Sequence, residues 1–115
     1  MDRVVIIGSG AAGLSAAIRL AEENVPSFIV EEMPPWRAQS NMAEGGINAA
    51  LDTMGQHDEP ALHEEETYKA GRFLALREAV HRLTHSAPKI VNTLFEWGMS
   101  LNLNEDATIQ QRSFG

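Results

Sequence analysis

A run of four β-branched residues leads directly into a glycine-rich turn near the start of this chain. The run is Val4 to Ile7, and the turn is Gly-Ser-Gly-Ala-Ala-Gly over residues 8–13. Apolar residues at helical spacing follow, so the pattern predicts a strand, a tight turn and a helix. In such a unit the first glycine permits the reversal, the second lets backbone approach phosphates, and the third lets the helix pack closely on the strand. The helix N-terminus then points its free N–H groups at an anion such as a pyrophosphate.

The next segment supplies a second strand that ends in an acid. Pro26 breaks the helix, residues 28–30 (Phe-Ile-Val) predict a strand, and Glu31 lies at its end. An acid about 20 residues after the glycines is placed to hydrogen-bond the hydroxyls of a ribose. We expect the two strands at about residues 3–7 and 27–31. A strand-turn-helix without a ligand is the alternative, and the coincidence of turn, helix, strand and acid disfavours it.

Composition excludes several classes of function. The chain has 115 residues, no cysteine and a formal net charge of −7. Disulfides, thiolate metal sites and a cysteine nucleophile are therefore impossible, and the acidic balance argues against a nucleic-acid partner. No apolar run approaches the ~20 residues of a transmembrane segment, and the first strand leaves no room for a secretory signal. We expect a cytoplasmic protein, peripheral to a membrane only through partner subunits.

The organisation predicted for the chain is incomplete for a dinucleotide-binding domain. Such a domain needs several parallel strands, and no Val/Ile-rich run after residue 46 supplies them. About residues 1–52 contain the strand-helix-strand unit and a glycine-rich loop, and about residues 53–115 form a mainly helical segment. We therefore expect the N-terminal portion of a longer protein, in which the rest of this domain and a substrate-capping domain lie elsewhere.

Local signals predict the connections and helices. Pro34 and Pro35 predict a loop over residues 32–44, and the glycines at 45–46 predict a short helix over residues 47–51. Residues 52–59 predict a polar loop. Pro60 suits the first turn of a helix that extends to about Phe73, and its acidic run at residues 64–66 predicts a solvated face.

Two further helices are predicted in the second half. One covers residues 78–85. Ser86 caps the other, which has Pro88 in its first turn, inward-facing apolar residues over 90–97, and Gly98 as the residue that ends it. The remainder predicts irregular structure with a short strand near Ile109.

The four histidines are not expected to bind a metal. His81 and His85 lie four residues apart, a spacing that can place two imidazoles on one ion. The residues between them lack the glutamate of a His-Glu-x-x-His motif, and no third ligand is evident in the sequence. His57 and His63 are expected to be surface or satisfied histidines as well. No serine lies in the context of a nucleophile elbow, so no hydrolytic triad is predicted.

The glycine turn and Glu31, taken with residues 37–51 (RAQSNMAEGGINAAL), closely resemble the flavoprotein subunits of succinate dehydrogenases and fumarate reductases. The likeness continues through His63, Glu66-Thr67, Ala70-Gly71, Ala87-Pro88, Trp97-Gly98 and the final Gln-Arg-Ser-Phe-Gly at residues 111–115. It covers essentially the whole chain, but only the first part of a family member. The resemblance implies an α/β fold, the N-terminal part of a Rossmann-like FAD-binding domain.

The resemblance also implies a cofactor site and a substrate. The turn would hold the FAD pyrophosphate and Glu31 the adenosine ribose, while residues 38–46 would wrap the isoalloxazine ring, with Ser40 and residues 43–46 closest to its reactive face. Phe114 matches a phenylalanine that packs against a bound C4 dicarboxylate such as fumarate or succinate. Hydride transfer between the flavin and this substrate is the implied chemistry, and an iron–sulfur electron-transfer subunit is an implied partner. The residues expected to bind FAD are Gly8, Ser9, Gly10, Ala11, Ala12, Gly13, Glu31, Glu32, Ala38, Gln39, Ser40, Asn41, Met42, Ala43, Glu44, Gly45 and Gly46.

One departure from the family pattern concerns the attachment of the flavin. Membrane-bound members carry a histidine at the position of Gln39 and attach FAD to it covalently. Glutamine cannot form that bond, so we expect non-covalent FAD. In the family, covalent attachment goes with a higher potential and competence to oxidise succinate, so fumarate reduction, or another substrate, is favoured for this chain.

No catalytic residue is expected within the chain. The family's catalytic arginine and substrate-binding histidines lie beyond residue 115, so these residues alone should be inactive. L-Aspartate oxidases share the fold and the non-covalent flavin, but they usually carry Thr-Arg-Glu-Gly-Gly where this chain has residues 111–115. A non-catalytic, truncated FAD-binding fragment is the other alternative. An NAD-dependent dehydrogenase is disfavoured, because a glycine-rich loop follows Glu31 instead of a further strand-helix unit.

Overall fold

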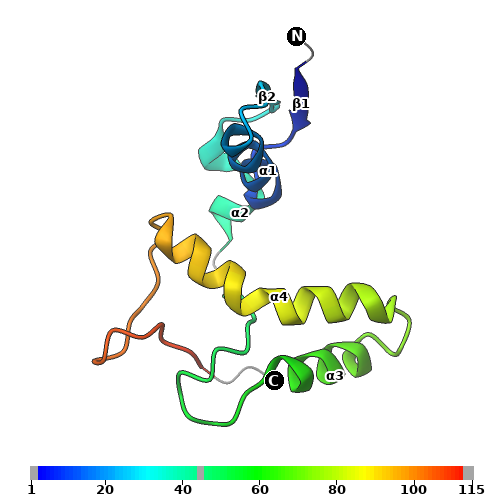
Figure 1. Cartoon of the computed structure of the whole chain (residues 1–115), viewed down its shortest axis with the longest axis vertical. Helices are drawn as coiled ribbons and strands as arrows, with labels where there is room; N and C mark the ends of the chain where they lie inside the picture. Colours follow the sequence, from blue (N-terminus) through cyan, green and yellow to red (C-terminus); the bar gives the residue numbers. More distant parts are fainter. Residues whose placement is uncertain (1–2, 44–45, 113–115) are drawn as a thin grey trace. The chain divides into compact units, whose positions relative to one another are not determined.

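The chain folds into two compact units, residues 1–45 and residues 46–115 (Figure 1). The computed structural model describes residues 3–43 and 46–112. None of the helices in these described ranges has the length and apolar character needed to cross a membrane.

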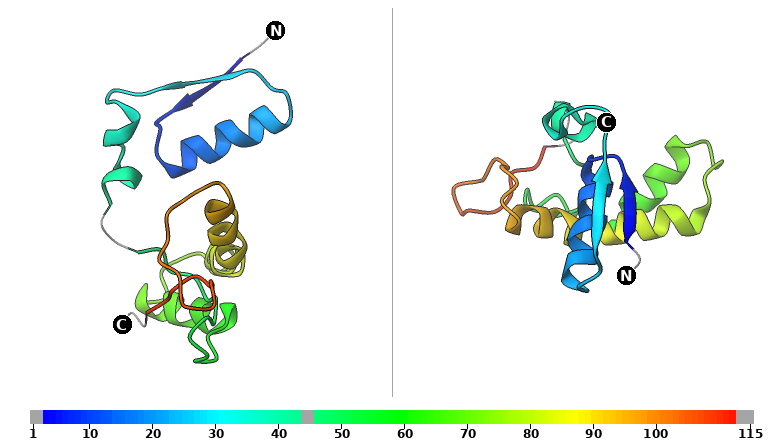
Figure 2. Two further views of the ribbon diagram at one scale, coloured as in Figure 1. Left: turned by 90° about the vertical axis from the view of Figure 1, so that its left-hand side faces the viewer. Right: turned by 90° about the horizontal axis from the view of Figure 1, so that it is seen from above.

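The first unit is a strand-helix-strand arrangement. Strands β1 (Val4–Ile7) and β2 (Ser27–Val30) pair in parallel, and helix α1 (Ala11–Glu22) connects them. The register pairs Val4 with Ser27 and Ile7 with Val30. Figure 2 shows α1 lying along the two strands. The predicted strand positions and the α/β class are confirmed.

Sequence explains where these elements stop. Helix α1 ends at Glu22, and Asn24 takes a left-handed φ of 56° before Pro26. The carbonyl of Pro26 then accepts a hydrogen bond from the N–H of Val4 at 3.0 Å, which fixes the start of the strand pair. Ile7 is 88% exposed, although parallel strands normally bury both of their faces.

The connection after β2 is more ordered than predicted. It contains a 3₁₀ turn η1 (Pro35–Arg37) and a short helix α2 (Gln39–Met42), where the two prolines predicted only loop. Proline excludes helix interiors but suits a first helical position, because no backbone donor is needed there. Pro35 occupies that position in η1.

The second unit is built on a helical hairpin. Helices α3 (Pro60–Ala70) and α4 (Arg77–Glu96) lie side by side (Figure 1), with Val80, Thr84 and Val91 of α4 buried. Pro60 begins α3 as predicted, but the helix ends at Ala70. Phe73 lies outside it with φ of 60°, so the predicted extension to that residue is wrong.

A single helix of 20 residues replaces the two that were predicted over residues 78–97. Pro88 lies inside α4, not in the first turn of a new helix. It lacks the N–H that would bind the Thr84 carbonyl, and the helix continues through it with buried positions on both sides. Of the apolar residues predicted to face inward, Val91 is buried, whereas Ile90 and Trp97 are about half exposed.

The end of α4 follows the predicted chemistry. Gly98 has φ of 95° and its N–H donates to the Phe95 carbonyl, while the N–H of Met99 donates to the Leu94 carbonyl. This is a Schellman motif, in which glycine takes the left-handed position after the helix.

The segment before α3 is not helical, so the short helix predicted over residues 47–51 is wrong. The side chain of Gln111 explains why: its Nε2 donates to the Ala49 carbonyl at 2.7 Å, and its Oε1 accepts from the N–H of Thr53 at 3.0 Å. Ala50 between them is buried. The strand expected near Ile109 is a single antiparallel bridge to Leu103.

Candidate functional site

The glycine turn joins the end of β1 to the start of α1. Gly8 has φ of 102°, in the left-handed region that favours glycine, and its N–H donates to the Val30 carbonyl at 2.9 Å. Gly10 is the cap of α1, and it offers no side chain to the free amides of the first helical turn. Such amides and the positive end of the helix dipole bind anions.

Gly13 is where helix and strand come closest. A Cβ atom at this position would lie 2.0 Å from the carbonyl oxygen of Gly8 and 3.4 Å from Cγ2 of Ile6. Both of these neighbours are held in place, the first as backbone and the second in a strand. Only glycine therefore allows α1 to lie this close to the turn.

Glu31 reaches back from the end of β2 to the turn. Its Oε2 accepts hydrogen bonds from both the N–H and the hydroxyl of Ser9, the latter at 2.9 Å. The Ser9 N–H is the main cause that lowers the pKa of Glu31, and the Ser9 hydroxyl adds to it. Ser9 is only 2% exposed, so the carboxylate is fixed against a buried partner.

Ser40 brings α2 to the same turn. Its Oγ accepts a hydrogen bond from the N–H of Ala11 at 3.0 Å, the first amide of α1. A Cβ at Gly10 would lie 3.2 Å from this Oγ, so the missing side chain makes room for the hydroxyl. The backbone amides of Ser9 and Ala11 thus donate to side-chain oxygen atoms that lie 22 and 29 positions further along the chain, respectively.

The other expected cofactor residues fall into three groups. The N–H of Glu32 donates to Oε1 of Glu31, and the side-chain amide of Asn41 donates to the Trp36 carbonyl. Ala12, Gln39, Met42 and Ala43 are exposed beside the turn or on α2, and Ala38 is half-buried before α2. Gly46 belongs to the second unit, and Glu44, Gly45 and Phe114 lie outside the described residues.

One histidine departs from the sequence expectation. The Nδ1 atom of His63 is buried and has no hydrogen-bond partner among the described residues, so this histidine is not fully satisfied. His57 is an exposed loop residue with φ of 59°. No pattern in the sequence indicates the buried nitrogen of His63, because burial there depends on the packing of the second unit.

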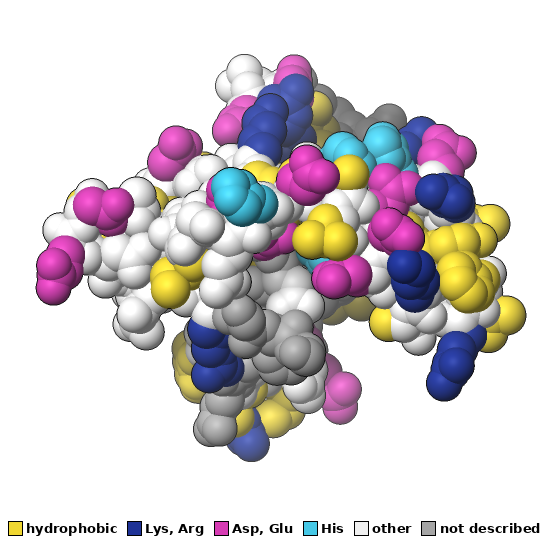
Figure 3. All heavy atoms as spheres, turned by 90° about the horizontal axis from the view of Figure 1, so that it is seen from below, with side chains coloured by type: hydrophobic (Ala, Val, Ile, Leu, Met, Phe, Trp, Pro, Cys, Tyr) yellow, Lys and Arg dark blue, Asp and Glu magenta, His cyan; other side chains and the backbone are white. Residues whose placement is uncertain are grey.

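Figure 3 shows how charged side chains are distributed over one face of the protein. On that face the described Lys and Arg side chains lie at separate positions, some beside acidic side chains and others beside hydrophobic ones. This distribution agrees with the net charge of −7.

Comparison with known proteins matches nearly the whole chain to one family. A family model described as "FAD binding domain" matches residues 3–115. The succinate dehydrogenase flavoprotein subunit of Bacillus subtilis is 34% identical over 112 residues, which are 97% of this chain and 19% of that protein. One subunit of the fumarate reductase (CoM/CoB) of Methanothermobacter marburgensis is 36% identical over 113 residues, 97% of this chain and 21% of that protein.

Solved structures agree in fold. The Mycobacterium smegmatis Sdh1 complex in the apo form contains a chain that superposes with a TM-score of 0.92 at 32% identity. The match covers 100% of this chain and 20% of the other. The chain therefore spans about a fifth of the length of the relatives it matches.

Proposed function

This chain belongs to the FAD-binding domain family, and on that premise we propose that it is the N-terminal part of an FAD-dependent oxidoreductase of the succinate dehydrogenase and fumarate reductase type. The observation that carries the proposal is the turn itself. Gly13 lies against the carbonyl of Gly8, and the carboxylate of Glu31 accepts a hydrogen bond from the N–H of Ser9.

The residues around the turn fit a dinucleotide. Amides at the start of α1 and at Ser9 would hold the pyrophosphate, and the carboxylate of Glu31 would accept the ribose hydroxyls. The amides of Ser9 and Ala11 donate to Glu31 and Ser40, which places both side chains beside the proposed pyrophosphate position. Residues 38–46 would lie along the isoalloxazine ring, with Ser40 and residues 43–46 on its reactive side.

Gln39 supports a non-covalent attachment. It is exposed at the first position of α2, and an amide side chain has no ring nitrogen for a bond to the flavin. The lower potential that goes with non-covalent flavin favours reduction of fumarate over oxidation of succinate. A measured two-electron potential high enough to accept electrons readily from succinate would contradict this direction.

The substrate proposed is a C4 dicarboxylate such as fumarate or succinate. Bound FAD would supply hydride exchange with it, and this chain's share would be to hold and orient the cofactor. Phe114 would pack against the substrate. The cationic groups that a dianion needs are expected outside these 115 residues, because the chain itself is acidic.

We propose that the protein works together with partner subunits. The relatives are subunits of larger complexes, and the M. smegmatis chain belongs to one. An iron–sulfur electron-transfer subunit is the proposed partner, and a peripheral position on the cytoplasmic side of a membrane would follow from docking to such subunits.

The experiment is to purify the full-length protein and to record its visible absorption before and after denaturation. Flavin absorbance in the native protein, with all flavin released as free FAD, supports the proposal. Fumarate reduction by a reduced dye then tests the substrate, with L-aspartate as the competing one. A colourless protein with intact helices would contradict the proposal and would indicate a chain that does not bind flavin.

A further inference from the structure

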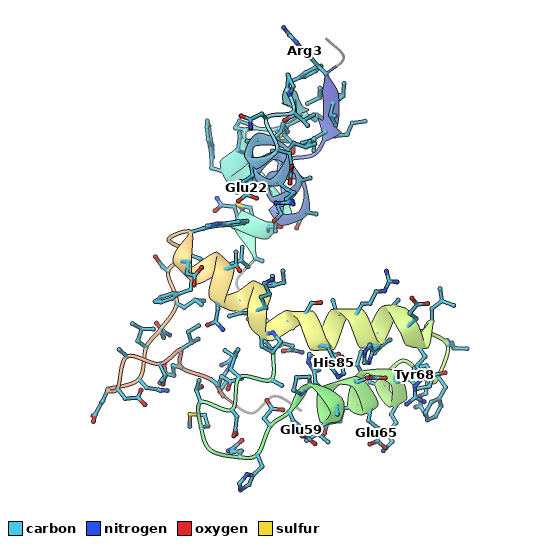
Figure 4. The ribbon with its side chains drawn as sticks, viewed as in Figure 1. Arg3, Glu22, Glu59, Glu65, Tyr68 and His85 are labelled. Carbon is cyan, nitrogen blue, oxygen red and sulfur yellow. The ribbon has the colours of Figure 1, made fainter. Side chains whose placement is uncertain are left out.

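The helical hairpin of the second unit brings three potential metal ligands together. Glu64 comes from α3, and His81 and His85 come from α4. One ligand atom from each residue lies within 4.8 Å of those of the other two. Figure 4 shows His85 on the side of α4 that faces α3, and Figure 3 shows histidine side chains beside acidic ones on the surface.

The carboxylate of Glu64 is the centre of this cluster. Its Oε2 lies 2.8 Å from Nδ1 of His81 and 3.6 Å from Nδ1 of His85. The side chain of Glu64 is only 14% exposed, whereas the neighbouring Glu65 is 61% exposed and pairs with Lys69. The sequence predicted that Glu64 belongs to a solvated acidic face, and the low exposure of its side chain shows that it does not.

The two imidazoles are held close by their own helix. They lie four residues apart, with ring centroids 3.9 Å from one another. Nδ1 of His85 also lies 3.0 Å from the backbone carbonyl of His81, a contact in which that nitrogen carries the proton. Its Nε2 is then the nitrogen free to bind a cation, and a carbonyl on the other ring nitrogen is the usual orienting contact of a ligand histidine.

We propose that Glu64, His81 and His85 form a binding site for a divalent transition-metal ion of the zinc, nickel or copper class. Imidazole and carboxylate ligands suit these ions, and two histidines with one carboxylate leave further positions for water. The ion would join α3 to α4. The site goes beyond the proposed flavin chemistry, because it lies in the second unit and uses none of the turn's residues.

Charges around the site are mixed. Nε of Arg77 lies 3.5 Å from Oε1 of Glu64, and the guanidinium also lies over the ring of Tyr68. Because Arg77 contacts one carboxylate oxygen and the histidines face the other, the metal would take Oε2. Oε2 is also the oxygen that lies 2.8 Å from Nδ1 of His81.

The test is calorimetric titration of zinc chloride into full-length, tag-free protein that has been treated with a chelator. Saturable binding is expected, and Glu64→Gln, His81→Gln and His85→Gln should each weaken it by about tenfold or more. Glu65→Gln and His57→Asn are the matched controls, and both should bind zinc as the original protein does.

Two further measurements separate ligation from a structural effect. Zinc should raise the thermal midpoint of the original protein but not of the His81→Gln variant. Glu64→His replaces the carboxylate by another ligand and should retain binding. Absence of saturable binding, or equal affinity in the three ligand variants and the two controls, would overturn the site; loss in the histidine variants alone would overturn the role of Glu64.

Discussion

Both donors of Ser9 meet a single carboxylate oxygen, Oε2 of Glu31, which lies 22 residues further along the chain. The contact joins the turn after β1 to the end of β2 and lowers the pKa of Glu31. A turn suited to hold an anion thus holds a carboxylate of its own. The Ser9–Glu31 contact therefore fixes the turn against the end of β2 through groups of the chain itself.

The first prediction concerns acid stability. The folded-state pKa of Glu31 is lowered, so its contribution to stability is present above the ordinary carboxyl pKa of about 4.3 and is lost as pH falls through the lower folded value. Glu31→Gln should therefore reduce the loss of stability below about pH 4.3. Urea unfolding across this pH range measures it, with Glu32→Gln as the control. Identical acid profiles for the two variants would show that the Ser9 contact contributes nothing.

The second prediction concerns Gly13. Gly13→Ala places a methyl group 2.0 Å from the carbonyl oxygen of Gly8, which must move with the strand or the helix. The free energy of unfolding should fall by about 3 kcal/mol, the upper end for overpacking, and bound flavin should be lost. Gly71→Ala is the matched control, because its Cβ would meet only an ordinary contact at 3.4 Å. A Gly13→Ala protein with full flavin content would refute the close-packing argument.

The third prediction concerns Gln111. Its side chain satisfies the Ala49 carbonyl and the Thr53 N–H, both in the non-helical segment before α3. Gln111→Ala leaves these groups unpaired and should cost about 2 kcal/mol of unfolding free energy. Chemical denaturation measures the loss, and Gln110→Ala is the neighbouring control. Equal stability of the two variants would mean that water replaces the Gln111 contacts without cost.

The fourth prediction concerns Pro88. Pro88→Ala restores a backbone donor to the Thr84 carbonyl inside α4 and should raise the free energy of unfolding by about 1–3 kcal/mol. Lys89→Ala, which changes a side chain but no backbone donor, should have a much smaller effect. If Pro88→Ala instead lowers stability, the ring's packing outweighs the missing hydrogen bond.

Local chemistry predicted the first unit well. Four β-branched residues, a glycine turn, an amphipathic helix and Pro26 each specify the same strand-helix-strand arrangement, and β1, α1 and β2 lie where expected. The close approach at Gly13 was also expected from its spacing. These features depend on neighbours in sequence, so a single chain reveals them.

Tertiary contacts decided the parts that were predicted wrongly. Gln111 lies 58–62 positions after Thr53 and Ala49, and its side-chain hydrogen bonds to them keep residues 49–53 out of a helix. In α4, buried residues on both sides of Pro88 stabilise a single helix that runs through the proline. Glu64 as a third potential ligand was equally hidden. It lies 17 residues before His81 and meets it only because α3 and α4 form a hairpin.

Acid precipitation of the purified full-length protein separates free flavin from flavin bound to the chain, and so tests whether the glycine turn binds FAD non-covalently. We expect an equimolar amount of FAD in the supernatant, no flavin in the precipitated protein, and no flavin in either fraction of the Gly13→Ala variant. Flavin that stays with the precipitated protein, or a native protein without flavin, would contradict non-covalent FAD binding at the glycine turn.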